Sequence, residues 1–210
     1  MIRRPALVIL LVLLLAGVAC QTMKKVAYDL DPSQRPAEAA YREAIAPYIS
    51  KGEIYHGPAT ELLIRALPLV TPVRLAMARR KAAAYDLDQA QLEQELAAAR
   101  KDGAGDLEVV AAVYMPEEQW NNLDSQRPSW RVYLKPATGP KLHAVDARRI
   151  KKRSALNQAL YPFWGMWSRL YRLRFPFKPD AKGNYPGTQG TVKLIIAGPP
   201  GMVELPLRLK

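Results

Sequence analysis

The sequence offers little that could cross-link the chain or hold a transition metal. It contains one cysteine, Cys20, and two histidines, His56 and His143. A single cysteine excludes a disulfide within the chain, so packing alone must stabilise the folded part. A zinc site needs three or four ligands, and two histidines far apart in the sequence do not supply them. We therefore expect no metal and no other cofactor.

Recognisable catalytic motifs are also absent. No serine lies in a Gly-x-Ser-x-Gly elbow, and the chain has no Gly-rich phosphate loop. Acidic pairs occur at Glu117-Glu118 and at Asp86 with Asp88, and two carboxylates about 5–10 Å apart in a cleft can cleave a glycosidic bond. The sequence predicts that the protein is not an enzyme. The alternative is a carbohydrate-active envelope hydrolase in which Glu117 or Glu118 is the acid or base.

Long apolar runs are missing except at the N-terminus. Arg3 and Arg4 precede an apolar run over residues 6–19, and polar residues from Gln21 onward end it. A membrane-spanning helix needs roughly 20 apolar residues, so this run is too short to be a permanent span. A positive start, a short apolar core and small residues at its end are typical of a secretory signal. We therefore expect residues 1–19 to be a signal peptide.

The single cysteine stands directly after this signal. The segment from Leu15 to Cys20, LAGVAC, resembles the signal peptides of bacterial lipoproteins. This resemblance covers about the first tenth of the chain and implies that the peptide is cut before Cys20, which then carries the lipid. Two or more acyl chains hold a protein firmly in a membrane, because each buried CH₂ contributes about 0.8 kcal/mol. In a Gram-negative lipoprotein, Gln21 after the cysteine indicates the outer membrane, with the domain facing the periplasm.

One position departs from that class. Lipoprotein signals favour an aliphatic residue three places before the cysteine, and this chain has Gly17 there. The segment from Gly17 to Ala19 also fits the small-x-small cleavage site of an ordinary secreted protein. Secretion with an unmodified Cys20 is therefore the alternative to lipid attachment.

The rest of the sequence predicts a tether and one domain. Residues 20–35 contain Asp31-Pro32 and run into Arg35-Pro36, and these pairs interrupt regular structure. Residues 36–210 are long enough for a single mixed domain, helix-rich over 36–103 and β-rich over 104–210.

The helix-rich part contains three predicted helices and one extended segment. An apolar face predicts a helix over residues 37–50, whose last turn Pro47 weakens. Residues 53–69 have an extended pattern with both faces partly apolar. Thr71 followed by proline predicts a helix to about residue 85, capped by the Thr71 hydroxyl.

A second helix start follows at once. Asp88 and Gln91 have the spacing of a capping box, and Gly103 marks the end of that helix. The helices over 71–85 and 88–103 are therefore predicted to form a helical hairpin.

From residue 106 the hydrophobic pattern changes to the period of two that is typical of strands. The predicted strands cover residues 107–115, 130–135, 142–150, 171–177, 192–196 and 203–209, with a short helix over 154–160. Pro206 lies opposite the leucines of the last strand, which indicates an edge strand. We expect an α+β fold: an antiparallel β-sandwich of immunoglobulin-like shape, with an N-terminal helix and an inserted helical hairpin.

The net charge of +12 is concentrated in one region. Residues 131–178 contain twelve Lys or Arg and one acid, Asp146. Aromatic residues are interspersed among the cations from residue 161 to 171. This composition is typical of surfaces that bind nucleic acid, but the predicted export of the protein argues against that partner. It equally suits a membrane interface with anionic lipid. The candidate contacts with an anionic surface are Arg148, Arg149, Lys151, Lys152, Arg153, Arg172 and Arg174. Alternatively, the aromatics fill the core and the cations form the wet face of strands.

A second candidate contact lies in the polar stretch 117–129. Trp120, Asn121 and Asn122 suit a sugar or a partner protein, because aromatic rings stack on sugar rings and amides bind hydroxyl groups. The same stretch could equally be a solvated loop between two strands.

Taken together, these features predict a membrane-anchored envelope lipoprotein with a non-enzymatic binding or scaffolding role. Its expected partners are the membrane, through acylated Cys20, and anionic lipid, lipopolysaccharide, cell-wall polymer or another envelope protein. We expect no nucleic acid. The alternatives are the hydrolase or a sugar-binding module, and a docking part of a secretion or appendage assembly.

Overall fold

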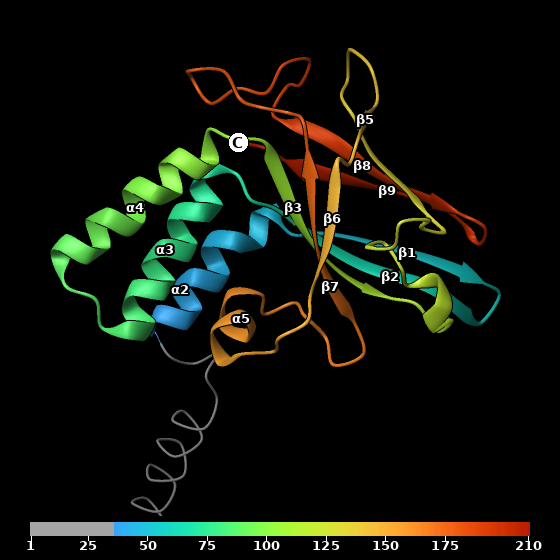
Figure 1. Cartoon of the computed structure of the whole chain (residues 1–210), viewed down its shortest axis with the longest axis horizontal. Coiled ribbons are helices and arrows are strands. Elements are labelled where there is room, and N and C mark those ends of the chain that lie inside the picture. Colours follow the sequence, from blue (N-terminus) through green and yellow to red (C-terminus); the bar gives the residue numbers. More distant parts are fainter. Residues whose placement is uncertain (1–35) are drawn as a thin grey trace, which may run out of the picture. The chain divides into compact units, whose positions relative to one another are not determined.

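The computed structural model describes residues 36–210 (Figure 1). The predicted signal peptide, Cys20 and the tether lie outside the described residues. The chain divides into two units, 1–40 and 41–210. Helix α2, Pro36–Ile45, runs across that division, and the strands and remaining helices belong to the second unit.

Helix α2 is shorter than predicted. The α-helix ends at Ile45 and continues as a single 3₁₀ turn, Ala46–Tyr48, before strand β1 begins at Ser50. Pro47 explains the difference, because proline lacks the N–H that would extend an α-helical ladder.

Strands β1, Ser50–His56, and β2, Ala59–Pro68, then form an antiparallel hairpin. The sequence pattern predicted one extended segment here and missed the turn, which Gly57 makes possible with a φ of 56°.

The predicted helical hairpin is confirmed. Helices α3, Thr71–Tyr85, and α4, Gln89–Gly103, lie side by side between β2 and β3 in the chain (Figure 1). Asp88 caps α4 through a complete capping box with Gln91. The start of α3 differs in detail: Val70 is its N-cap and no side chain caps it, so the predicted role of the Thr71 hydroxyl is wrong.

Two antiparallel sheets account for the strands of the described residues, so the fold is mixed α+β as predicted. The first sheet has the order β1-β2-β3-β7-β6, and the second has the order β5-β4-β8-β9. The remaining strands are β3, Leu107–Tyr114; β4, Arg131–Lys135; β5, Leu142–His143; β6, Asp146–Ile150; β7, Arg169–Phe175; β8, Thr191–Gly198; and β9, Gly201–Arg208. The predicted strand 142–150 is two short strands, one in each sheet. Strand β9 lies at the edge of its sheet, which confirms the prediction from Pro206.

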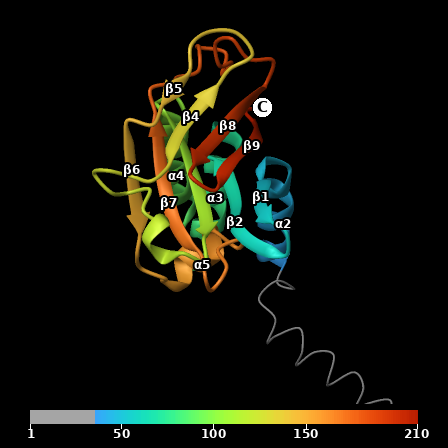
Figure 2. The same ribbon diagram turned by 90° about the vertical axis from the view of Figure 1, so that its right-hand side faces the viewer.

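One hydrophobic core joins the helices and both sheets. It includes Leu62 and Ile64 of β2, Val109 of β3, Leu194 of β8 and Leu205 of β9, all almost completely buried. Helices α3 and α4 lie on the side of the five-stranded sheet away from β8 and β9 (Figures 1 and 2). The central strand β3 is therefore buried on both faces, which explains its nearly continuous apolar sequence.

A glycine lets the two sheets approach closely. A Cβ atom built on Gly52 of β1 would lie 2.5 Å from Val203 Cγ2 and 3.3 Å from Leu205 Cγ, both on β9. Any larger residue at position 52 would displace these side chains.

Helix α5, Ala155–Leu160, connects β6 to β7 and confirms the predicted short helix. Its N-cap is Ser154, whose hydroxyl accepts a hydrogen bond from the Asn157 amide. The Tyr41 hydroxyl of α2 donates a 2.6 Å hydrogen bond to the Leu160 carbonyl at the end of α5. This contact places the entry of the chain into the second unit directly beside the segment that follows α5.

Candidate functional site

Several of the predicted cations lie on β6 and β7 and face acidic residues. Arg148 and Arg172 are directly opposite each other in the sheet, as are Asp146 and Arg174. Arg148 pairs with Asp146 at 2.8 Å, and Arg174 pairs with Asp106 at 2.9 Å. These contacts neutralise part of the charge that the sequence concentrates here.

Arg153 holds a turn in place. Its guanidinium donates to the carbonyls of Gly165 (2.6 Å), Met166 (3.1 Å) and Ser168 (3.2 Å). It also stacks 4.2 Å above the centre of the Trp164 ring. The Trp164 indole N–H in turn donates to the Ser168 carbonyl at 2.9 Å. A planar guanidinium with several donors suits such a role, so the segment 164–168, called here the 164–168 turn, is a fixed structure.

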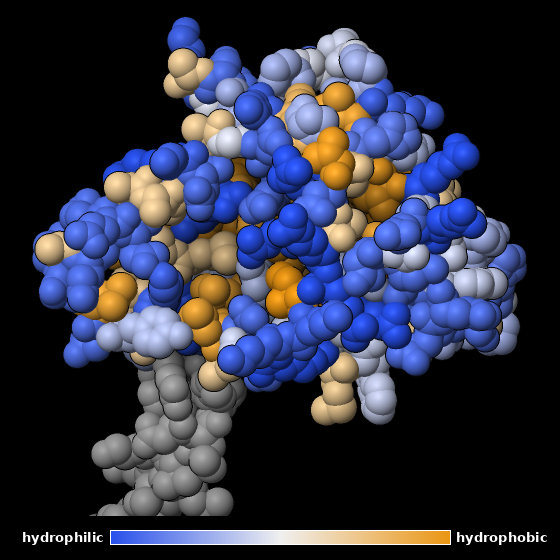
Figure 3. Space-filling view, in the orientation of Figure 1, coloured by the Kyte–Doolittle hydropathy of each residue, from blue (hydrophilic) through white to orange (hydrophobic). Residues whose placement is uncertain are grey.

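The 164–168 turn presents two large apolar side chains to water. Met166 is 78% exposed and Trp167 is 79% exposed. Most other exposed residues are hydrophilic, and apolar residues appear only in small patches on the face shown in Figure 3. An exposed tryptophan beside an exposed methionine on a fixed turn marks a contact surface more strongly than a scattered apolar residue does.

Arg149 and Lys151 lie close to this turn, and Lys152 follows them in the chain. A hollow of about 240 Å³ is lined by Arg149, Lys151, Met166 and Trp167, among others, and by Glu118, which is paired with Arg169. Within residues 36–210, neither Arg149, Lys151 nor Lys152 forms an ion pair. The structure therefore divides the seven predicted contact cations into four that are bound within the fold, Arg148, Arg153, Arg172 and Arg174, and these three, which form no ion pair.

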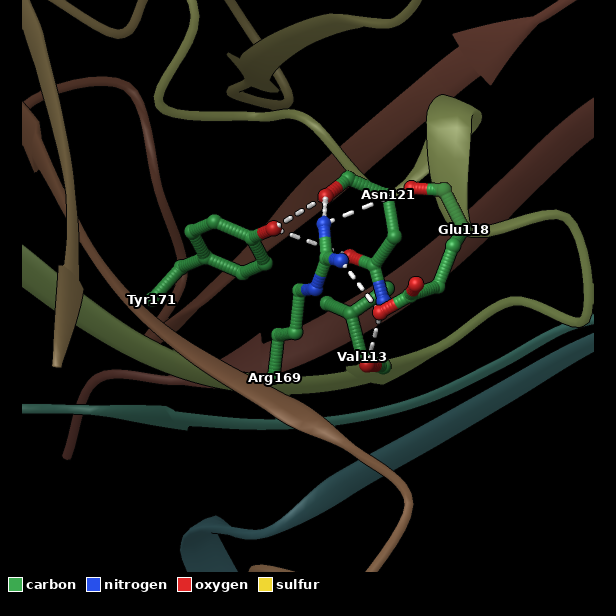
Figure 4. A network of polar contacts seen from close by, with 5 residues as sticks. All are labelled: Val113, Glu118, Asn121, Arg169 and Tyr171. Atoms are coloured by element: carbon green, nitrogen blue, oxygen red, sulfur yellow. Dashed lines mark hydrogen bonds and ion pairs between the residues drawn. The ribbon is translucent and has the colours of Figure 1, made fainter. Parts of the chain in front are cut away.

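Arg169 and Tyr171, which follow the turn in the chain, belong to a polar network around the buried Asn121 (Figure 4). Asn121 is 2% exposed, and its amide nitrogen donates to the Val113 carbonyl at 3.1 Å. The Tyr171 hydroxyl lies 2.6 Å from the Asn121 main-chain carbonyl oxygen and 2.9 Å from its side-chain oxygen. Arg169 donates to the same main-chain carbonyl and pairs with the Glu118 carboxylate at 2.6 Å. The network fastens the 116–130 loop to β7 and β3.

The two asparagines that are predicted to contact a sugar form hydrogen bonds within the chain. Asn121 belongs to the network above, and the Asn122 amide exchanges hydrogen bonds with Ser129 at 2.9 and 3.1 Å. The Trp120 carbonyl accepts from the indole N–H of Trp130 at 2.9 Å. The sugar contact stays a prediction, and both amides already form hydrogen bonds within the chain.

The acidic pairs and histidines have local surroundings of their own. Asp88 caps α4 and Asp86 ends α3 with a φ of 50°, while Glu118 is paired with Arg169. His56 lies 4.0 Å from Glu61, and the ring of His143 lies 5.5 Å from that of Tyr133. Within the described part of the chain, no three His, Cys, Asp or Glu side chains gather as metal ligands would.

Sequence reasoning identified Trp167 as one of several aromatics but did not separate it from those of the core. Tyr161, Phe163 and Tyr171 are buried, whereas Trp167 is exposed. Met166 was missed. The only signal for both was Gly165, which suggests a turn within an otherwise aromatic run.

Comparisons with known proteins give no family. No family model matches the chain, and no curated protein matches it. A crystal structure of a novel protein of unknown function from Burkholderia pseudomallei K96243 is similar at 14% identity and a TM-score of 0.38, covering 87% of this chain and 88% of the other. Across residues 36–210, no helix has the length and apolar character needed to cross a membrane.

Proposed function

We propose that this protein is a membrane-anchored envelope lipoprotein with a non-enzymatic binding or scaffolding role. In this proposal the 164–168 turn, with Arg149, Lys151 and Lys152, rests on an anionic membrane surface. The exposure of Met166 and Trp167 carries the proposal. Tryptophan prefers the headgroup level of a bilayer, and each nearby cation contributes about 1 kcal/mol at an anionic surface.

The length of the predicted tether supports a position close to the membrane. The predicted tether of residues 20–35 leads into α2, and Tyr41 of α2 bonds to the end of α5, which leads into the 164–168 turn. Sixteen extended residues reach at most about 55 Å. An anchor at Cys20 would therefore keep the second unit close to the membrane.

The predicted location and partners remain parts of the proposal. We place the anchor in the outer membrane with the domain in the periplasm, on the basis of Gln21. The anionic surface would be lipid, with lipopolysaccharide, cell-wall polymer or another envelope protein as further partners of the same charge.

We also propose that the two sheets form the predicted β-sandwich. The shared core and the close approach of Gly52 to Val203 and Leu205 support it. The immunoglobulin-like shape stays a prediction.

The anchor is tested by metabolic labelling with radioactive palmitate. We expect the native chain to be labelled and Cys20→Ala to be unlabelled. An unlabelled native chain, or equal labelling of both chains, would exclude lipid attachment at Cys20.

The contact surface is tested on the anchored protein in vesicles of phosphatidylglycerol with brominated acyl chains, which quench nearby tryptophans. We expect Trp167→Phe to remove more than half of the quenching, because Trp167 is exposed on the turn. Trp120→Phe is the matched control and should change it little, because Trp120 packs against the core. Equal quenching in the native chain and Trp167→Phe would contradict the proposed orientation.

A further inference from the structure

A second, larger hollow also borders the 164–168 turn. It measures about 400 Å³ and lies between the turn and the outer face of β1, β2 and β3. Its apolar lining includes Leu63, Tyr114, Phe163, Met166 and Trp167. The volume is within the range of about 300–1,000 Å³ that is typical of small-molecule sites. We call it the β1–β2 groove.

The groove exists because the face of the sheet that carries Leu63 is only partly covered by other residues. Leu63 and Leu67 of β2 point to the same face, as do their partners Tyr114 and Val110 on β3. Leu67 and Val110 are completely buried, whereas Leu63 is 36% exposed. The same apolar face is therefore buried at one end and left open at the other.

Two cations stand opposite each other at the groove. Lys51 of β1 and Arg65 of β2 are directly paired in the antiparallel register, and both line the groove. Like charges in this position destabilise a sheet. Among the residues that the structure describes, neither forms an ion pair, and the nearby Glu53 carboxylate accepts a 3.2 Å hydrogen bond from the Tyr55 hydroxyl. With Glu53 included, this part of the groove carries one net positive charge, which suits an anion.

The groove is continuous with the proposed membrane contact. Met166 and Trp167 line both the β1–β2 groove and the hollow beside Arg149 and Lys151. A ligand entering from the membrane would therefore pass from one to the other across the same two side chains.

We propose that the β1–β2 groove binds one anionic phospholipid molecule drawn from the membrane. Its acyl chain lies along Leu63, Tyr114 and Phe163, and its phosphate lies between Lys51 and Arg65. This inference depends on the proposed function only in taking the membrane as the source of the lipid. Its chemistry follows from an apolar groove whose lining also holds two cations without ion-pair partners.

The test uses the anchored full chain in vesicles that contain a phosphatidylglycerol with a diazirine in its acyl chain. After illumination, mass spectrometry locates the cross-linked residues. We expect labels on β2 and β3 near Leu63 and Tyr114, as well as on the 164–168 turn. The double variant Lys51→Glu, Arg65→Glu should reduce the labels on β2 and β3 at least fivefold and leave those on the turn unchanged.

A matched control is Arg131→Glu, Lys135→Glu, which reverses two exposed cations on β4 outside the groove lining and should leave all labels unchanged. A phosphatidylcholine probe with the same diazirine should label the groove several-fold less. The site is overturned if labels are confined to the turn, if they persist in Lys51→Glu, Arg65→Glu, or if both probes label the groove equally. Labels in the groove without labels on the turn would uphold the site and contradict the proposed membrane contact.

Discussion

Two neighbouring parts of the chain share a composition of arginine and aromatic residues but differ in what surrounds them. Arg169 and Tyr171 belong to the buried network, where the Arg169 side chain is 21% exposed and pairs with Glu118. Trp167, two residues earlier, is 79% exposed and lies beside cations without acidic partners. The network holds a loop to the sheet, whereas the turn is held in place and leaves its apolar side chains in water.

The difference shows where composition stops being informative. In the network, Arg169 and Tyr171 form hydrogen bonds with buried main-chain carbonyls, so their polar groups already have partners within the fold. In the 164–168 turn, Arg153 and the Trp164 indole satisfy the main-chain carbonyls, and the side chains of Met166 and Trp167 stay exposed. The four predictions below test this division, from the largest expected effect to the smallest.

Asn121→Leu should destabilise the fold most. It removes the donor to the buried Val113 carbonyl and places an apolar group among polar atoms. We expect the free energy of unfolding to fall by about 2–3 kcal/mol, measured by urea denaturation. Gln126→Ala, an exposed change in the same loop, is the control and should stay within about 0.5 kcal/mol. A similar small change for Asn121→Leu would mean that the network is not structural.

Lys151→Gln, Lys152→Gln should weaken the contact with the membrane without affecting the fold. At about 1 kcal/mol for each cation, the ratio of docked to undocked protein should fall about 30-fold on anionic vesicles. Quenching of Trp167 by brominated phosphatidylglycerol measures that ratio. The same change made at Arg131 and Lys135 is the control, since these cations lie on β4 and outside the lining of the hollow beside the turn. Indistinguishable quenching in the two double variants would contradict the proposed contact of Lys151 and Lys152 with the membrane.

Arg153→Lys should loosen the turn alone. A lysine keeps the charge but cannot donate to three carbonyls and stack on Trp164 at the same time. We expect the Ser168 amide, which bonds to the Gly165 carbonyl at 3.1 Å, to exchange its hydrogen about five- to tenfold faster, equivalent to about 1 kcal/mol of local stability. Arg148→Lys serves as the control, because Arg148 contacts Asp146 rather than the turn. Unchanged exchange in Arg153→Lys would show that Arg153 does not fix the turn.

Alkaline pH should destabilise the fold through its buried tyrosines. Burial raises the pKa of Tyr171 above its ordinary value, an effect that the Arg169 hydrogen bond partly offsets, and burial likewise raises the pKa of Tyr161. Above about pH 10 the unfolded chain releases these protons first, so the folded state loses stability as the pH rises further. Melting temperatures from pH 8 to 11.5 should therefore fall above about pH 10. Tyr171→Phe should reduce that slope, and the exposed Tyr85→Phe should not; equal slopes would contradict the assignment.

Local sequence signals located most elements of the fold. Asp88 with Gln91 predicted the start of α4, Pro206 predicted an edge strand, and the period-two pattern predicted β3 and β7. These signals succeed because capping, proline and alternation act within a few residues of the chain. The turn at Gly57 was missed, because neighbouring apolar residues on both faces hid the change of direction.

The candidate site was less predictable because it depends on contacts between distant residues. Seven cations looked equivalent in the sequence, but Arg174 faces Asp106 and Arg153 faces the carbonyls of the turn. The β1–β2 groove combines Lys51, Arg65 and Trp167, which are far apart in the chain and carry no shared motif.

The sequence by itself determined the order of most helices and strands, the concentration of positive charge and the expectation of a lipid anchor at Cys20. Each of these depends on neighbouring residues or on composition. Only the tertiary structure decided which aromatics are buried, which cations keep acidic partners and where the sheet face stays open. Those properties depend on how strands pair and what covers them, because a side chain's environment is set by residues that the linear sequence does not place beside it.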